Sequence, residues 1–196
     1  MGGGLRICAR FSIALFFVQP LLGCVFTPHE LALAPKTQVT DSDVGGGTDL
    51  YFRFVDERDD TTVGHRGVAT VGAKISADAL PTLMESQIRE GLARKQYHLV
   101  DTESPNHPSV VFRLVSFKYY VEQGFWTGGE EVNAALAVDA RRADKSFNNV
   151  YRYSNDHRLV VVPGGSELDT QMNTALNDIL SKEANDRSLD SFLTGK

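Results

Sequence analysis

The chain has 196 residues, a formal net charge of −5 and two cysteines. This moderately acidic balance lacks the Lys and Arg clusters that nucleic-acid phosphates and anionic lipid headgroups require, so we expect no nucleic-acid partner. Both cysteines, Cys8 and Cys24, lie in the first 24 residues, so the rest of the chain has neither a disulfide nor a free thiol.

The first 23 residues have the pattern of a secretory signal peptide. Arg6 and Arg10 precede an uncharged run over residues 11–22, and the small residue Gly23 follows it. This run is shorter than the roughly 17–25 apolar residues that a membrane-spanning helix needs. Pro20 would also interrupt a helix there. We therefore expect residues 1–23 to be removed as a signal peptide.

The end of this run, Leu21-Leu22-Gly23-Cys24, resembles the lipobox of bacterial lipoproteins. The resemblance implies cleavage before Cys24, a diacylated Cys24 thiol and an acylated new amino group. Several acyl chains on one residue anchor a protein stably. We expect a protein held on the membrane surface by covalent lipid such as palmitate, with no other cofactor. Secretion without lipidation is the alternative.

Residues 24–48 are expected to be the lipidated cysteine and a flexible tether. They contain Pro28, Pro35 and the triple glycine at 45–47, and they show no hydrophobic periodicity. A flexible chain of this length spans about 25–30 Å. At most a short extended piece is expected to dock on the domain that follows.

Residues 49–196 are expected to form one domain. Residues 50–56 predict a strand, residues 57–74 a polar, turn-rich section, and residues 80–96 a helix capped by Ser76 or Asp78. Further strands are predicted at residues 97–100, 110–121 and 132–138, with a turn over residues 123–131.

Extended pieces at residues 150–154 and 159–162 follow, as one bent strand or a hairpin. Ser166 and Asp169 match a capping box and open a second amphipathic helix, and a short helix closes the chain. This order predicts an α+β fold. We expect a two-layer sandwich in which two amphipathic helices cover one face of a mainly antiparallel sheet of about five strands.

This layout resembles the YajG family of uncharacterised bacterial lipoproteins. The residues that carry the resemblance are the lipobox, the helix running into Gln96-Tyr97-His98-Leu99, the strand from Val110, the Gln123-Gly124 turn, the strand from Val132, the Asn173-Thr174-Ala175-Leu176 helix and the tail over residues 190–193. None of these is a catalytic motif. The resemblance therefore implies a fold and an envelope location rather than a chemical activity.

No pattern of catalytic or metal-binding residues emerges. The five histidines stand singly, whereas zinc wants three or four converging ligands. Ser166 is not in a Gly-x-Ser-x-Gly elbow, and the glycine clusters lack the Gly-Lys-Ser/Thr ending of a phosphate loop. Glu130 and Glu131 are interpreted as a solvated acidic pair. We expect no catalytic residue and no metal site.

One surface feature predicts a contact. Phe125 and Trp126 lie in a glycine-flanked turn, where aromatic rings are hard to bury, and Tyr119 and Tyr120 at the adjoining strand end would extend the patch. Rings that fold back over the open face of the sheet are the alternative to contact with a protein or with lipid.

These features together predict a non-enzymatic accessory or adaptor of an envelope complex, anchored in the outer membrane on its periplasmic side. Val25 stands where an Asp would favour retention in the inner membrane of enteric bacteria. A sheet edge or the Trp126 turn is the expected contact with a partner protein. A lipid-binding or lipid-transport module is the second hypothesis and a cell-wall enzyme the third. Partner identity and oligomeric state stay open.

Overall fold

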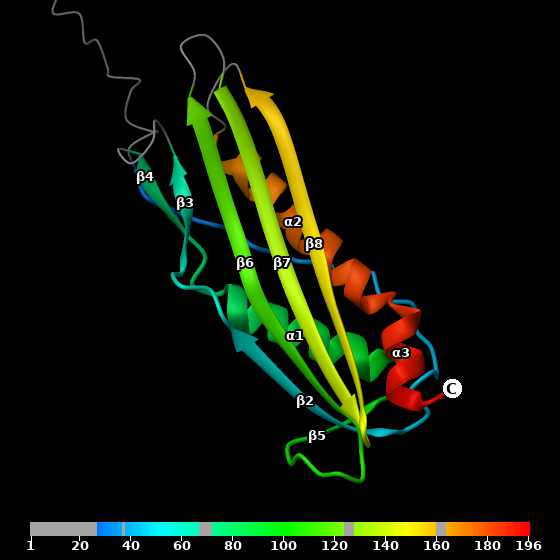
Figure 1. The fold of residues 1–196 in the computed structure, drawn as a ribbon. Helices are drawn as coiled ribbons and strands as arrows, with labels where there is room; N and C mark the ends of the chain where they lie inside the picture. Colours follow the sequence, from blue (N-terminus) through cyan, green and yellow to red (C-terminus); the bar gives the residue numbers. More distant parts are fainter. Residues whose placement is uncertain (1–26, 37, 67–71, 124–127, 160–163) are drawn as a thin grey trace, which may run out of the picture.

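A five-stranded mixed sheet with two helices packed on one of its faces forms the centre of the protein (Figure 1). The computed structural model describes residues 27–36, 38–66, 72–123, 128–159 and 164–196. The predicted α+β class and the two helices on one face are confirmed.

The order of the sheet is β5-β2-β6-β7-β8. Its strands are β2 Asp49–Asp56, β5 His98–Val100, β6 Ser109–Gln123, β7 Gly128–Arg142 and β8 Lys145–Leu159. β2 runs parallel to both of its neighbours, whereas the other pairs are antiparallel. The sheet is therefore more mixed than predicted. The helix between β2 and β5 returns the chain to the same end of the sheet, which makes this pair parallel.

The three long strands differ from the sequence prediction in where they end. β7 begins at Gly128, so the second half of the predicted turn is strand. β8 is continuous from Lys145 to Leu159 and pairs with β7 over its whole length. The polar residues that suggested a break in this strand therefore lie within it. The part of the second extended piece beyond residue 159 falls outside the described residues.

A second, three-stranded sheet occupies much of the section expected to be turn-rich. Its order is β1-β4-β3, with β1 His29–Glu30, β3 Thr62–Arg66 and β4 Ala73–Ser76. β3 lies beside the part of β6 that extends past the end of β2, and Lys118 Nζ donates to the Thr62 carbonyl oxygen at 2.8 Å. Glycines and polar residues hid these strands because both are depleted in ordinary strands.

The first helix, α1, spans Leu80–Arg94 and buries Leu80, Met84, Ile88 and Leu92 at the predicted spacing of four. Its N-cap is Ala79, with no side-chain hydrogen bond to the helix, so neither Ser76 nor Asp78 caps it. Pro81 in the first turn needs no N–H donor and suffices to start the helix.

The second helix, α2, spans Gly165–Ala184, and α3 spans Arg187–Thr194. The N-cap of α2 is Gly164 without a side-chain cap, so the predicted capping box is wrong. Asp169 bonds instead to the N-terminal segment. Asp186 caps α3 by accepting from the backbone N–H groups of Ser188 and Leu189.

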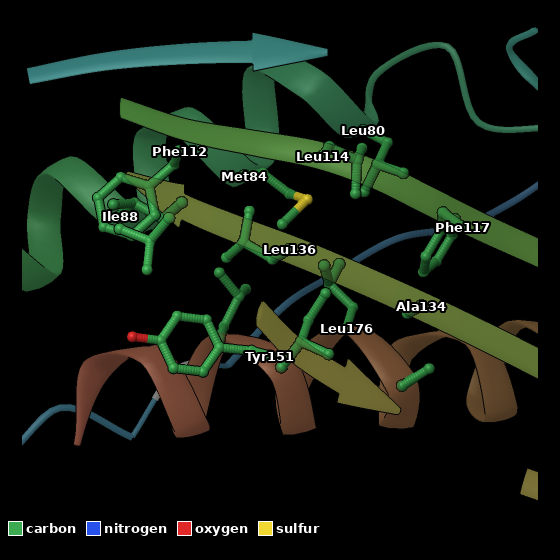
Figure 2. Close-up of a cluster of buried hydrophobic side chains, with 14 of the residues drawn as sticks. Leu80, Met84, Ile88, Phe112, Leu114, Phe117, Ala134, Leu136, Tyr151 and Leu176 are labelled. Atoms are coloured by element: carbon green, nitrogen blue, oxygen red, sulfur yellow. The ribbon is translucent and has the colours of Figure 1, made fainter. Parts of the chain in front are cut away.

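One continuous hydrophobic core fills the space between the sheet and the helices (Figure 2). The inward residues of β6 and β7 pack against the apolar stripes of α1 and α2. Tyr151 of β8 is also buried in this core. The labelled members are Leu80, Met84, Ile88, Phe112, Leu114, Phe117, Ala134, Leu136, Tyr151 and Leu176. Burial at this density makes each member sensitive to truncation.

The N-terminal strap, residues 29–36, is docked along α2 rather than free. The backbone N–H groups of Ala32, Ala34 and Lys36 donate to the side chains of Asp169, Asn173 and Asn177 at 3.1, 2.7 and 2.7 Å. The donors are two residues apart on the extended strap, a rise of about 6.6 Å, and the acceptors are four residues apart on the helix, a rise of about 6.0 Å. The two spacings therefore match. Helix side chains thus replace a neighbouring strand.

The docking continues on both sides of this ladder. Leu31 is buried in the core and its N–H donates to the Ser76 carbonyl oxygen at 2.9 Å. Val39 is buried, and the N–H of Gly45 donates to the Lys95 carbonyl oxygen at 2.8 Å. The docked part is therefore much longer than the short piece expected, and the described residues between 27 and 48 belong to the domain.

Candidate functional site

Most of the sequence-predicted site residues fall outside the described part of the chain. These are the lipobox residues Leu21, Leu22, Gly23 and Cys24, and the aromatic pair Phe125 and Trp126. None of the described helices has the length and apolar character to cross a bilayer. The lipid anchor and the aromatic turn stay predictions.

The two tyrosines expected beside the aromatic turn lie on opposite faces of β6. Tyr119 is 2% exposed, and its hydroxyl donates to Glu130 Oε2 at 3.2 Å. Burial and the Glu130 carboxylate raise the pKa of this hydroxyl. Tyr120, the next residue along the strand, is 50% exposed. A partner at this end of the strand would therefore meet Tyr120 and not Tyr119.

Glu130 is the centre of a buried polar cluster, which corrects its interpretation as a solvated acid. It is 2% exposed in β7, and Gln171 Nε2 of α2 donates to its Oε1 at 2.6 Å. Buried Arg66 at the end of β3 contributes a positive charge close to Tyr119. The cluster joins β3, β6, β7 and α2. Each carboxylate oxygen of Glu130 accepts one hydrogen bond from another element, so we assign the cluster a structural role.

A second buried cluster fastens α3 to the end of α1. Lys95 Nζ donates to both carboxylate oxygens of Asp190 at 3.0 and 2.9 Å, and the Tyr97 hydroxyl lies 3.3 Å from the same carboxylate. Glu183 is buried nearby. Burial, together with Asp190 and Asp186, raises the pKa of Glu183 to about 8 against the opposing charge of Lys95.

Neither cluster resembles a catalytic or metal centre. Among the described residues, no group of three or more His, Cys, Asp and Glu side chains is placed to hold a metal ion. His29 Nε2 lies 2.7 Å from Asp169, and His98 Nδ1 lies 2.6 Å from Asp49, so these two histidines have separate carboxylate partners. The described residues point to no reaction.

The hollow beside Tyr120 is lined by both polar and apolar residues. It has a volume of about 380 Å³ and is lined by Asp60, Thr62, His65 and Lys118 in addition to apolar residues of β3 and β6. Charged groups at such a wall would lose solvation against an acyl chain. This hollow therefore does not favour the lipid-binding hypothesis.

The open edge of the five-stranded sheet is the strongest candidate for a contact surface. β8 ends the strand order, and Figure 1 shows no strand on its outer side. An unpaired edge presents N–H and C=O groups to any extended chain that approaches it. Fifteen residues make a long edge by the standards of globular proteins.

Among the described residues, side chains bond to outward backbone groups in the first part of this edge. The Val150 N–H donates to the Asn149 side chain at 2.8 Å, and the Arg152 carbonyl oxygen accepts from Lys182 Nζ at 2.8 Å. Both backbone groups therefore point away from β7. Outward groups recur at every second residue of an antiparallel strand, so those of Ser154 and Asp156 point the same way.

The remaining part of the edge is open to a partner. Within the described residues, the backbone groups of Ser154 and Asp156 have no hydrogen-bond partner, and both residues are exposed. We name residues 154–159 of β8 the free edge. Its sequence contains no proline, one of the devices that commonly protect edge strands.

Two features of the site were missed in the sequence. The ladder residues Asp169, Asn173 and Asn177 recur every four residues along α2, a spacing that also fits an ordinary solvated helix face. The free edge was missed because the polar residues at 155–157 left open whether one bent strand or a hairpin forms there. A period of two among polar residues 152, 154 and 156 was the available signal.

Comparison with known proteins identifies the family but no activity. A family model described as an uncharacterised lipoprotein matches residues 35–194. No curated protein matches the chain. The match starts at residue 35, near the end of the strap, so it covers the five-stranded sheet and the three helices but leaves out β1 and most of the strap.

Comparison with solved structures finds similar chains at low sequence identity, and one of the following three has a TM-score above 0.5. Protein XCC0632 from Xanthomonas campestris has a TM-score of 0.51 and 10% identity, covering 86% of this chain and 96% of that one. The hypothetical protein CT253 from Chlamydia trachomatis has a TM-score of 0.39 and 12% identity, covering 76% and 99%. Lipoprotein GNA1162 from Neisseria meningitidis has a TM-score of 0.30 and 10% identity, covering 66% and 94%.

Proposed function

Because the chain belongs to the YajG family of uncharacterised lipoproteins, we propose that it is a lipid-anchored, non-enzymatic accessory protein of the cell envelope that binds a partner protein through the free edge of β8. The observation that carries this proposal is the run of outward backbone groups at Ser154 and Asp156 without partners among the described residues.

The anchor in this proposal is covalent lipid on Cys24, after cleavage between Gly23 and Cys24. Val25 in the following position favours the outer membrane as the site of anchoring. The membrane attachment raises the local concentration of the domain around envelope partners, so a modest docking affinity suffices.

Docking by strand addition fits the chemistry of the free edge. An extended segment of the partner would exchange backbone hydrogen bonds with residues 154–159, and its alternate side chains would meet the two faces of the sheet. Arg152 and Asp156 carry opposite charges at the outward positions on either side of Ser154 and would set the register of the added strand. Each backbone hydrogen bond contributes about 0.5–1.5 kcal/mol.

The test is in-cell photo-crosslinking with a photoreactive residue at Asp156, followed by mass spectrometry. Asp156 is exposed and lies in the free edge, whereas Glu90, exposed on α1, serves as the matched control position. The proposal expects one dominant protein adduct from position 156 that is absent from position 90. Adducts to lipid alone, or the same adducts from both positions, would contradict it. A probe at position 126 reports separately on the predicted aromatic contact.

A further inference from the structure

We propose that the end of the domain that carries β1, β4 and the first turn of α2 rests against the lipid headgroups of the membrane, with α3 at the far end. We call the first of these the β1 end. The inference rests on the proposed lipid anchor at Cys24, and it adds an orientation that the anchor alone does not fix.

The first step is that the strap is held to the domain. The chain is fixed from His29, a few residues after the proposed anchor at Cys24. His29 and Glu30 pair with Ile75 and Ser76 of β4. Glu30 also accepts from the backbone N–H of Asp78 at 2.8 Å, and the His29 ring lies 2.7 Å from Asp169. The ladder on α2 follows directly. A chain held by this many contacts does not act as a free tether.

The second step is reach. His29 is five positions after Cys24, and an extended chain covers at most about 3.6 Å per position, or about 18 Å in all. The chain between the anchor and β1 therefore spans at most about 18 Å. A flexible segment reaching to residue 48 would allow a much larger distance between the anchor and the domain. Such a short connecting segment keeps the β1 end near the bilayer.

The third step is the distance between the β1 end and the opposite end of the domain, measured along the long strands. β3 and β4 lie beside the Tyr119 region of β6, whereas the β7–β8 turn at Asp144 lies beyond the other end of this strand. Ten strand residues separate these levels, which corresponds to about 33 Å at 3.3 Å per residue. Figure 1 shows β1's partner β4 and α3 at opposite ends of the fold.

The orientation also places the free edge close to the membrane. Successive register pairs connect the level of β1 to that of the free edge: His29 with Ile75, Ile75 with Gly64, Tyr119 with Val132, and Val132 with Asn155. Gly64 lies against Tyr119 and completes the series. A partner strand added at the free edge would therefore come from a protein segment near the bilayer.

Fluorescence quenching in vesicles tests this orientation on the full lipidated protein. Lys74→Cys places a label on β4 at the β1 end, and Asp144→Cys places one in the β7–β8 turn. Both positions are exposed. With Cys8 removed and Cys24 lipidated, the introduced cysteine is the one free thiol. We expect nitroxide-headgroup lipids in phosphatidylethanolamine–phosphatidylglycerol vesicles to quench the Lys74 label several-fold more strongly than the Asp144 label.

Two controls make the result decisive. Combining Glu30→Ala and Asp169→Ala with each label removes the groups that bond to the Asp78 N–H and to the His29 ring, so it loosens β1 itself and should reduce the difference between the labels. Equal quenching of both labels in the intact protein on floated vesicles would overturn the orientation alone. The Cys24→Ala variant is the control for flotation, because it cannot carry the lipid. If the intact protein also failed to float with vesicles, both the anchor and the orientation would be overturned.

Discussion

The backbone of Gly64 in β3 lies so close to that of Tyr119 in β6 that a Cβ atom at Gly64 would stand 2.1 Å from the Tyr119 carbonyl oxygen. Two backbones in such contact leave no flexible side chain to move aside. This contact is where the three-stranded sheet meets the long strands, and it explains a glycine in the interior of a strand.

Gly64→Ala should lower the free energy of unfolding by at least about 2 kcal/mol, since overpacking of this kind forces a backbone shift. Gly91→Ala in α1 is the matched control, because a Cβ atom there meets only Val39 Cγ2, at the ordinary contact distance of 3.4 Å. Urea unfolding of both variants checks the prediction. Equal stability of the two variants would show that β3 does not approach β6 in this way.

The strap makes a second prediction. Removing two acceptors with Asn173→Ala and Asn177→Ala should speed amide exchange at Ala34 and Lys36 about tenfold, because each lost hydrogen bond contributes about 0.5–1.5 kcal/mol. Hydrogen–deuterium exchange with mass spectrometry over residues 31–38 measures it. Thr174→Ala, an exposed change on the same helix, should leave this exchange unchanged; unchanged exchange in the double variant would contradict the docking of the strap.

An element of this fold could be predicted from the sequence when a local periodicity marks its buried face. It could not be predicted when its hydrogen-bond partners are distant in the sequence. The stripe Leu80, Met84, Ile88 and Leu92 and the alternation from Val132 predicted α1 and β7, because both elements bury one face at a fixed period. The strap was predicted as flexible because its hydrogen-bond partners lie 137–141 residues away on α2. No local pattern reports contacts at that separation.

The candidate site shows the same limit. The polar run from Asn155 left one bent strand and a hairpin as alternatives, since polar residues suit both a turn and a solvated edge strand. Glu130 reads as an exposed acid, and its burial becomes evident only when Gln171 and Tyr119 are brought to it by other elements. Sequence periodicity identified the layers of the fold, while the buried acids and the free edge required the packing.

The buried ion pair between Lys95 and Asp190 predicts a large effect of Lys95→Met. The variant leaves the Asp190 carboxylate buried without its cation, which costs about 3–5 kcal/mol. Its neighbour Arg94 pairs with Asp41 on the surface, so Arg94→Met should cost no more than about 1 kcal/mol. Thermal unfolding of both variants distinguishes them, and similar losses would argue against a buried pair at Lys95.

Glu183 predicts a pH dependence of stability. Its pKa is raised from 4.5 to about 8, chiefly by burial, so the folded protein holds one more proton than the unfolded chain between these values. The free energy of unfolding should therefore fall as the pH rises from about 4.5 to about 8.

Glu183→Gln should flatten this decline, because glutamine does not titrate. Asp56 and Asp186, whose pKa values are lowered, contribute only in more acidic solution and do not affect this window. Urea unfolding at pH 5, 6, 7 and 8 compares the variant with the parent protein. The same decline in both would remove Glu183 as its cause.

Docking at the free edge is tested most directly by proline at an outward position. Ser154→Pro removes an N–H that points away from β7, so the strand keeps its own pairing while an added strand loses a hydrogen bond and meets the ring. Ser154→Ala retains the N–H and is the control. With the photoreactive residue at Asp156, we predict that the protein adduct persists in Ser154→Ala and is lost in Ser154→Pro at unchanged thermal stability. An equal yield of that adduct in both variants would contradict docking at the edge of β8.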